Sequence, residues 1–301
     1  MKNLAASVHA RLAQLRAKTG EDYNVLLVRF TLERLLYRLS RSRHRDQFIL
    51  KGAMLFAVWD SALHRATRDL DLLGFGQPTP ERLTEVFREL CGVEVEADGV
   101  VYDSRSVTCE DIRAQDEYAG IRVKLRATIG NAVVPVQVDV GFGDALPVAP
   151  EEITFPVLLD MTAPKLRAYA RETVVAEKFE AIVKLGMLNS RFKDYFDLHY
   201  LAQRFPFDGE LLAKSIAATF ERRGTALPAV LPAGLTPMFS SDPAKMRGWQ
   251  AFWLKTGLKG ECPTLEDVSL LLVKFLERPL EAASKKEPLA ATWKSGRWQK
   301  K

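Results

Sequence analysis

Two carboxylates stand two positions apart in segment 67–73 (TRDLDLL) of the chain. In a β-strand this spacing puts Asp69 and Asp71 on one face, while Leu70 and Leu72 point into a core. The two carboxylates would lie roughly 6–7 Å apart, because a strand rises about 3.3 Å per residue. Like charges this close are costly unless a cation lies between them, and Mg²⁺ prefers oxygen ligands. The pair therefore predicts a metal site, and the alternative is an edge strand with two solvated aspartates.

A β-hairpin predicted downstream offers a third carboxylate. Segments 121–129 and 133–140 alternate at period two, and Gly130-Asn131 supplies the turn. Three carboxylates beside cationic side chains are the layout of two-metal phosphoryl or nucleotidyl transfer. The predicted buried face carries Val123, Leu125, Val136, Val138 and Val140, and the opposite face carries Arg122, Lys124, Arg126, Gln137 and Asp139.

Segment 48–56 (FILKGAMLF) indicates an apolar strand, then a glycine, then the start of an apolar helix. A glycine there lets backbone N–H groups approach a phosphate, whose charge a helix N-terminus favours. Lys51 and Gly52 are therefore candidates for nucleotide binding.

A helix predicted over 172–188 carries a lysine in the middle of its apolar stripe. Lys178 is costly to bury without a partner, so it either reaches a phosphate or extends its ammonium to solvent. Glu177, Glu180 and Lys184 lie away from the stripe. The stripe consists of Val174, Val175, Ala181, Ile182 and Leu185.

The next predicted helix repeats the anomaly. Asp194 shares a stripe with Leu198 and Leu201, and Asp197 lies about one turn further along. Arg191 precedes Asp194 by three residues, so an i,i+3 ion pair is the alternative to a role in a site.

Taken together, these segments resemble a known superfamily. Lys51-Gly52, Asp69-x-Asp71 and segment 138–141 (VDVG), in that order, resemble the DNA polymerase β-like nucleotidyltransferases. More closely, the chain resembles the AbiEii/MenT-type toxins of type IV toxin–antitoxin systems, the AbiE abortive-infection type. The likeness runs from about Lys51 to segment 249–253. Its motifs are 50–53 (LKGA), 65–71 (RATRDLD), 138–144 (VDVGFGD), 175–181 (VAEKFEA) and 191–198 (RFKDYFDL).

The resemblance implies a toxin that transfers NMP from an NTP to an RNA, with tRNA as the expected acceptor, and so inhibits translation and growth. It also implies a cognate antitoxin. Nucleotidylation of a protein or small molecule is one alternative, and a catalytically silent nucleotide-binding interaction module is another. The implied metal ligands for Mg²⁺ or Mn²⁺ are Asp69, Asp71 and Asp139. The implied catalytic residues are Asp69, Asp71, Lys178 and Asp194, and the implied nucleotide-binding residues are Lys51, Gly52, Thr67, Arg68, Asp139, Arg191 and Asp197.

The chain departs from the superfamily at one position. Gly52-Ala53 stands where Gly-Ser or Gly-Gly is common, so a hydroxyl contact to the triphosphate is missing. Thr67 is the candidate to supply it, and its phosphorylation would place negative charge beside the aspartates. The alternative is a β-branched residue present for its strand propensity.

Composition favours a soluble, cytoplasmic enzyme. The chain has 301 residues, 47% of them hydrophobic, with three scattered cysteines and no paired cysteine–histidine spacing. No disulfide framework or structural zinc site is therefore expected. No signal peptide is expected, and apolar runs such as 270–273 are too short to span a bilayer.

The net charge of +5 and the pI near 9.0 favour a polyanionic partner. We expect RNA contacts from the basic stripe of the hairpin and from two basic clusters. The second cluster interleaves basic residues with tryptophans, which suits phosphate contact and base stacking, and its alternative is a frayed, solvated end. The first cluster is Arg34, Arg38, Arg41, Arg43, His44 and Arg45, and the second is Lys285, Lys286, Trp293, Lys294, Arg297, Trp298, Lys300 and Lys301.

The predicted fold is mixed α+β. Residues 1–163 form a nucleotidyltransferase-like sheet core preceded by a helical segment at about 4–40. Residues 164–301 form a largely helical domain that completes the active cleft. Segment 224–243, rich in proline and small residues, is expected to be a long loop.

Overall fold

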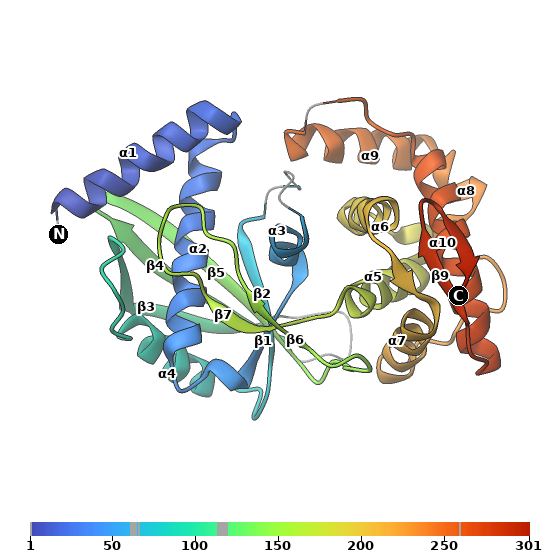
Figure 1. The fold of residues 1–301 in the computed structure, drawn as a ribbon, viewed down its shortest axis with the longest axis horizontal. Coiled ribbons are helices and arrows are strands. Elements are labelled where there is room, and N and C mark those ends of the chain that lie inside the picture. Colours follow the sequence, from blue (N-terminus) through green and yellow to red (C-terminus); the bar gives the residue numbers. More distant parts are fainter. Residues whose placement is uncertain (1, 61–64, 66, 113–119, 259) are drawn as a thin grey trace. The chain divides into compact units, whose positions relative to one another are not determined.

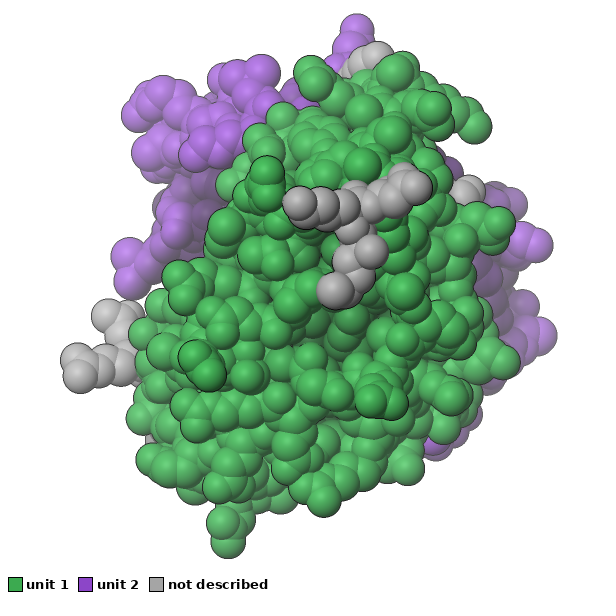
Figure 2. All heavy atoms as spheres, turned by 90° about the vertical axis from the view of Figure 1, so that its left-hand side faces the viewer, with its two compact units in different colours: residues 1–143, 150–169 green, residues 144–149, 170–301 purple. Residues whose placement is uncertain are grey.

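The computed structural model describes residues 2–60, 65, 67–112, 120–258 and 260–301 of the chain. Two compact units divide the chain (Figure 2). Unit 1 is Met1–Gly143 with Pro150–Tyr169, and unit 2 is Asp144–Ala149 with Ala170–Lys301. The predicted mixed α+β class is confirmed.

Unit 1 is built on a seven-stranded mixed sheet with the strand order β3-β4-β5-β2-β1-β7-β6 (Figure 1). Strand β2 pairs with β5 and β1 pairs with β7 in parallel, whereas the other neighbours are antiparallel. The strands are β1 (Phe48–Lys51), β2 (Asp69–Gly74), β3 (Val100–Ile112), β4 (Gly120–Ile129), β5 (Ala132–Phe142), β6 (Glu151–Thr154) and β7 (Lys165–Ala168).

The predicted hairpin is confirmed as β4 and β5. Val123 pairs with Val138, and Leu125 pairs with Val136, on the buried face. The predicted N-terminal helical segment is two helices, and α2 and α4 pack against strands of the sheet. The helices of unit 1 are α1 (Lys2–Thr19), α2 (Tyr23–Arg41), η1 (Arg45–Gln47), η2 (Gly52–Leu55), α3 (Phe56–Trp59) and α4 (Pro80–Cys91).

Part of the first predicted basic cluster is buried and cannot contact RNA. Arg38 is buried and donates to both oxygens of Asp98 at 2.6 and 3.2 Å, and to the Val100 carbonyl at 3.1 Å. Arg43 and Arg45 are paired with Glu89 and Glu152. The prediction was wrong for Arg34 and Arg38, because their part of α2 lies in the core, where a cation must be paired to be buried. For the exposed Arg43 and Arg45, RNA contact stays a prediction.

A second buried ion pair on α2 holds the connection between β6 and β7. Glu33 and Arg34 are adjacent in sequence and lie 3.1 Å apart. Glu33 accepts the Leu158 N–H at 2.7 Å, and Arg34 donates to the Thr162 carbonyl at 2.9 Å. These bonds satisfy backbone groups of a segment that has no strand partner of its own.

Unit 2 consists mainly of helices and one small three-stranded sheet with the order β10-β9-β8. Segment 224–243, predicted to be a loop, contains η4 and α8 between irregular stretches. The elements are α5 (Arg171–Leu185), η3 (Gly186–Leu188), α6 (Phe192–Arg204), β8 (Phe207–Asp208), α7 (Gly209–Arg222), η4 (Ala233–Leu235), α8 (Pro237–Ser240), α9 (Pro243–Thr256), α10 (Leu265–Lys285), β9 (Ala291–Lys294) and β10 (Arg297–Lys300).

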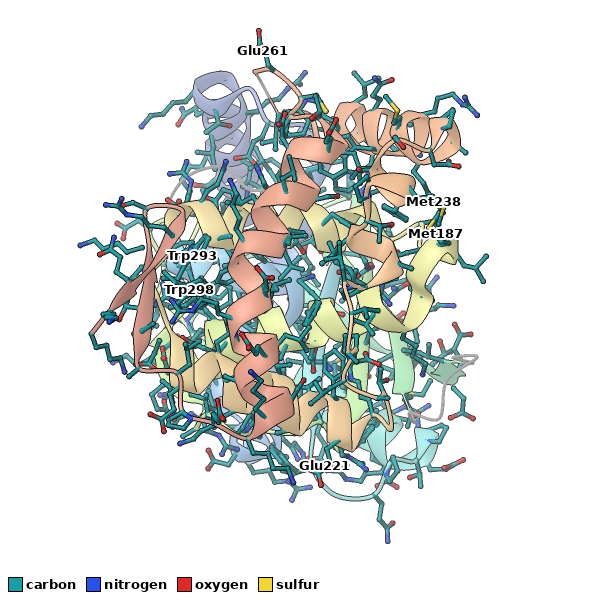
Figure 3. All side chains as sticks on the ribbon, turned by 90° about the vertical axis from the view of Figure 1, so that its right-hand side faces the viewer. Met187, Glu221, Met238, Glu261, Trp293 and Trp298 are labelled. Atoms are coloured by element: carbon teal, nitrogen blue, oxygen red, sulfur yellow. The ribbon has the colours of Figure 1, made fainter. Side chains whose placement is uncertain are left out.

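The basic C-terminal segment forms a packed hairpin, so the interpretation as a frayed end was wrong. The Trp293 ring is buried against Phe275 at 4.9 Å, and its indole N–H donates to the Ala202 carbonyl at 2.7 Å (Figure 3). Trp298 stacks on the same phenylalanine. The buried Trp293 therefore serves the core of unit 2 and cannot stack on a base, and Lys301 is ion-paired with Asp208. RNA contact by the exposed Lys294, Arg297 and Lys300 stays a prediction.

The buried Glu33 makes stability depend on pH. Burial raises the pKa of Glu33 from 4.5 to about 7, although the Leu158 N–H and Arg34 oppose the shift. The folded state therefore holds this proton more tightly between pH 4.5 and 7, and stability falls as pH rises from about 4.5 to 7. Glu33→Gln keeps an acceptor for Leu158, so it should remove a pH-dependent loss on the order of 3 kcal/mol.

Urea unfolding at pH 5 and pH 8 measures this difference. The exposed Glu277→Gln serves as the control and should keep the parental pH dependence. An unchanged pH dependence in Glu33→Gln would contradict the prediction.

Candidate functional site

A row of charged side chains crosses four strands of the unit 1 sheet. The registers place Lys51 of β1 beside Asp71, Asp71 beside Asp139 of β5, and Asp139 beside Arg122 of β4. Neighbouring strands lie about 4.8 Å apart, so these residues are adjacent across the sheet. In the next row of this face, the residue on β2 is Asp69. The structure thus brings the three predicted metal-binding aspartates onto one face of two adjacent strands.

The third aspartate is held by an arginine. Arg122 donates from Nε and Nη2 to the two oxygens of Asp139, each at 2.8 Å. The Asp139 bond is the largest cause that raises the pKa of Arg122, so this guanidinium stays charged. In the part of the chain that the structure describes, no three His, Cys, Asp or Glu side chains form a ready-made metal centre. The oxygen donors suit a hard divalent cation, but Asp139 can bind one only by sharing its carboxylate with Arg122.

The structure gives a reason for a glycine at position 52 that was not predicted from the sequence. Its φ is +75°, and a Cβ built there would lie 2.0 Å from Asp71 Oδ2. The carboxylate of Asp71 therefore occupies the space that a side chain at position 52 would need. The expected approach of backbone to a phosphate stays a prediction, and the observed constraint is the approach of the Gly52 backbone to Asp71.

The other predicted residues of unit 1 surround this row. Thr67 donates from Oγ1 to the Asp69 carbonyl at 3.2 Å, so its hydroxyl fixes the start of β2. The Lys51 ammonium lies 5.7 Å from the centre of the Tyr169 ring, at cation–π distance. Arg68 is exposed. Ala66 of the RATRDLD motif and His64 lie outside the described residues.

In unit 2, the predicted residues form an ion cluster between α5 and α6. Lys178 Nζ lies 2.9 Å from Asp194 Oδ1 and 2.7 Å from Asp197 Oδ2. Arg191 Nε donates to Asp194 Oδ2 at 2.8 Å, so the i,i+3 pair is present. The Lys178 side chain is 12% exposed, whereas the two aspartates are 1% and 0% exposed. Lys178 therefore does not extend its ammonium to solvent.

In this cluster, Lys178 and Arg191 face the carboxylates of Asp194 and Asp197. Burial alone would raise the pKa of Asp194, but Lys178 and Arg191 outweigh it and lower that pKa. The carboxylate thus stays ionised although it is buried. Removing one member of such a buried cluster is costly, because it leaves a charge without its partner.

A second cluster in unit 2 escaped sequence reasoning. Arg223 donates to Glu180 at 2.8 Å and also lies 3.3 Å from Glu177 and 3.9 Å from Asp144. Glu180 lies away from the apolar stripe, but it is buried because α5 also packs against α7. No local spacing signals these pairs, because Arg223 stands more than 40 positions from Glu180.

The family is shown by comparison with known proteins. The model of the AbiEii family, the nucleotidyl transferase toxins of type IV toxin–antitoxin systems, matches residues 34–267. The chain belongs to this family and is a nucleotidyltransferase. None of the helices in the described residues has the length and apolar character of a membrane span.

Two solved structures from Helicobacter pylori are similar to this chain. JHP933 is 16% identical with a TM-score of 0.47, and the match covers 85% of this chain and 92% of that one. A protein described as a candidate nucleotidyltransferase is 16% identical with a TM-score of 0.48, and the match covers 89% and 100%. No curated protein matches the sequence.

Replacing Gly52 tests the contact with Asp71. Gly224 also has a positive φ, +58°, but no atom lies within 4 Å of a Cβ built there. Gly224→Ala should therefore lower the free energy of unfolding only by the left-handed strain of about 1–2 kcal/mol. Gly52→Ala should cost a further 1–3 kcal/mol or so, because Asp71 must move. Urea unfolding compares the two variants, and equal losses would mean that Asp71 does not need the space at Gly52.

Replacing Lys178 tests the ion cluster. Lys178→Met leaves two buried carboxylates with one cation fewer, so it should destabilise unit 2 by about 3–5 kcal/mol at pH 7. The loss should shrink as pH falls below 3.8, because the stability contributed by a carboxyl of lowered pKa is itself lost there.

Adding Asp197→Asn to Lys178→Met should recover part of the loss. The exposed Lys193→Met on α6 is the control and should stay within about 0.5 kcal/mol of the parental protein. Urea unfolding gives these values. A Lys178→Met protein as stable as the parental one would contradict the structural role of the cluster.

Proposed function

We propose that this protein transfers an NMP group from an NTP to an RNA, with a tRNA as the acceptor, and that the reaction depends on Mg²⁺ or Mn²⁺. The observation that carries the proposal is the register of β1, β2 and β5. It aligns Asp71 with Asp139 and places Lys51 beside them. Family membership supports NTP as the donor substrate.

Asp69, Asp71 and Asp139 are the residues that would hold the cation. Bound there, the ion would offset the negative charge that builds up on the phosphates during transfer. The acceptor hydroxyl forms its bond to the α-phosphorus while the bond to pyrophosphate breaks. Asp139 takes the proton of that hydroxyl, and Arg122 holds the Asp139 carboxylate in one orientation.

Lys51 and the backbone at Gly52 contact the leaving phosphates, and Thr67 and Arg68 add contacts at the start of β2. In unit 2, Lys178 and Asp194 are the proposed catalytic residues, and Arg191 and Asp197 are the proposed nucleotide-binding residues. Lys178 is held by two carboxylates, so a phosphate would compete with them for the charge of the ammonium. A charge-assisted contact of this kind is stronger than a neutral hydrogen bond.

Transfer onto tRNA would inhibit translation and growth in the cytoplasm. The type IV toxin–antitoxin family further supports a cognate antitoxin as the protein partner. The basic stripe of β4 supports RNA as the acceptor, because its lysine and arginine side chains lie on the same face as the aspartates.

The test is incubation of the purified protein with each labelled NTP, Mg²⁺ and total tRNA. We expect label on the tRNA, and none when the metal is chelated. Asp69→Asn and Asp71→Asn should lose at least about 10³-fold in rate, since a cation contributes several kcal/mol to such a step. Asparagine keeps the shape, so circular dichroism should be unchanged.

The exposed Asp111→Asn on β3 is the matched control and should keep the parental rate. Full activity in either Asp69→Asn or Asp71→Asn would contradict the site. Label on protein or on a small molecule instead of RNA would contradict the acceptor.

A further inference from the structure

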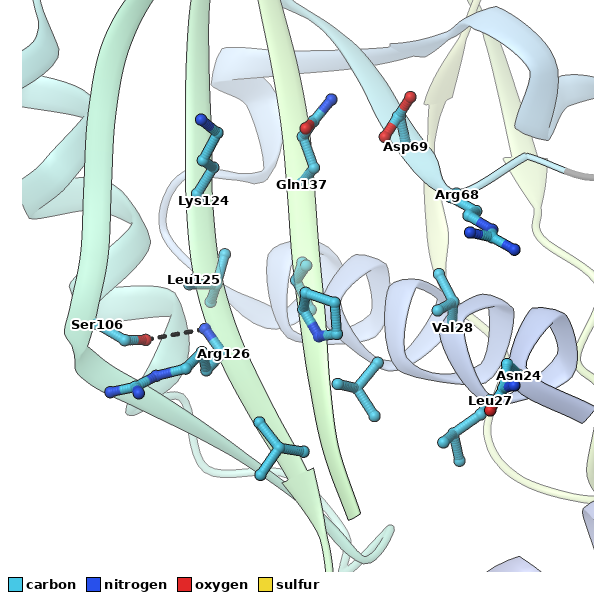
Figure 4. Close-up of a pocket in the computed structure, with 14 residues that line it drawn as sticks. Asn24, Leu27, Val28, Arg68, Asp69, Ser106, Lys124, Leu125, Arg126 and Gln137 are labelled. Atoms are coloured by element: carbon cyan, nitrogen blue, oxygen red, sulfur yellow. Dashed lines mark hydrogen bonds between the residues drawn. The ribbon is translucent and has the colours of Figure 1, made fainter.

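A pocket of about 740 Å³ lies in unit 1 beside Asp69 (Figure 4). Its upper rim is a row of polar side chains from three adjacent strands, Lys124 of β4, Gln137 of β5 and Asp69 of β2. This volume falls within the roughly 300–1,000 Å³ typical of small-ligand sites. The pocket therefore has room for part of a single strand but cannot enclose a nucleic-acid duplex.

The open edge of β5 contributes to this pocket. Strand β2 begins at Asp69, opposite Gln137, so residues 132–136 of β5 extend beyond β2. The Arg126 N–H points toward β3, where it donates to Ser106. The backbone groups of Arg126 and of its partner Pro135 on β5 therefore point away from each other, and those of Pro135 face the open edge. Because proline has no backbone N–H, this edge lacks a hydrogen-bond donor at position 135. An added peptide strand would lack a ladder bond there, which disfavours a peptide as the occupant.

Two cationic side chains of β4 also line the pocket, and they extend away from the aspartates. Lys124 and Arg126 share one face of β4, roughly 6–7 Å apart. Lys124 is ion-paired with Glu110, and Arg126 with Asp103 at 3.1 Å. All four side chains are largely exposed, and exposed pairs contribute at most about 1 kcal/mol. A phosphate can therefore replace either carboxylate at little cost.

The position of these cations distinguishes two possible occupants. An NTP carries its charge on the phosphates, which the proposed function places at the aspartate row. Lys124 and Arg126 would then face an uncharged nucleoside. A polynucleotide carries a phosphodiester at every nucleotide, so it presents a charge to each cation in turn. The exposed Val133 and Pro135 in the same pocket offer apolar surface to a base or ribose.

We infer that this pocket is the subsite for the acceptor and receives the single-stranded end of an RNA. Lys124 and Arg126 contact successive phosphodiesters, and the terminal hydroxyl lies toward Asp69. The inference rests on the proposed function and adds to it the location of the acceptor and the requirement for an unpaired end.

The experiment measures binding of a fluorescent single-stranded RNA oligonucleotide by anisotropy, and binding of a non-hydrolysable NTP analogue by calorimetry. The variant combines Lys124→Gln with Arg126→Gln. We expect its Kd for RNA to rise by about tenfold, and the slope of log K against log salt to become shallower by about 1.4, which corresponds to two phosphate contacts. Affinity for the NTP analogue should stay within about twofold.

The matched control is Arg88→Gln, an exposed arginine on α4 outside the pocket, which should leave RNA binding unchanged. In the transfer assay, the double variant should raise KM for RNA and leave KM for the NTP unchanged.

An unchanged salt slope in the double variant would overturn the inference, and so would a loss of affinity for the NTP analogue instead of RNA. An equal loss in Arg88→Gln would also overturn it. In each of these cases transfer by the parental protein persists and the proposed function stands. If the parental protein neither binds nor labels RNA, the proposed function fails and this subsite fails with it.

Discussion

Strand β2 pairs with β5 in parallel so that Asp71 lies beside Asp139 and Leu72 lies beside Val140. Side chains alternate between the two faces of a strand, so a slip of one residue would turn the carboxylates into the core and the leucines toward solvent. The apolar side therefore fixes the register, and the register fixes the charged row. Antiparallel pairing of β1 with β2 then adds Lys51, and the hairpin partner β4 adds Arg122.

The two units handle buried charge in different ways. In unit 1 the carboxylates occupy a half-exposed sheet face, where Arg122 holds Asp139 and the glycine at position 52 makes room for Asp71. In unit 2 the carboxylates of Asp194 and Asp197 are almost fully buried and depend on Lys178. A buried pair of this kind adds little net stability, but removing one partner is costly. The cluster therefore fixes the positions of its members more than it stabilises the fold.

The positive net charge gives a weaker argument for an RNA partner than its distribution does. Arg34 and Arg38 are structural, because they lie inside unit 1 with partners of their own. Trp293 of the C-terminal hairpin belongs to the core of unit 2. Lys124 and Arg126 remain on an exposed strand face, in weak surface pairs, beside the aspartate row. Their position along the strand, rather than the total charge, supports a polynucleotide as the acceptor.

Local pattern determined a large part of this protein. Alternation at period two gave the hairpin of β4 and β5 and its buried face, because one side of a half-buried strand must be apolar. The i,i+2 spacing put Asp69 and Asp71 on one face, and the i,i+3 spacing gave the pair of Arg191 with Asp194. Only the tertiary structure decided which strands are neighbours, and therefore that Asp71 lies beside Asp139. It also decided the partners of Arg38, Lys178 and Arg223, since each pairs with a residue at least 16 positions away. Such pairs follow from the packing of helices and strands, and no periodicity within one element encodes them.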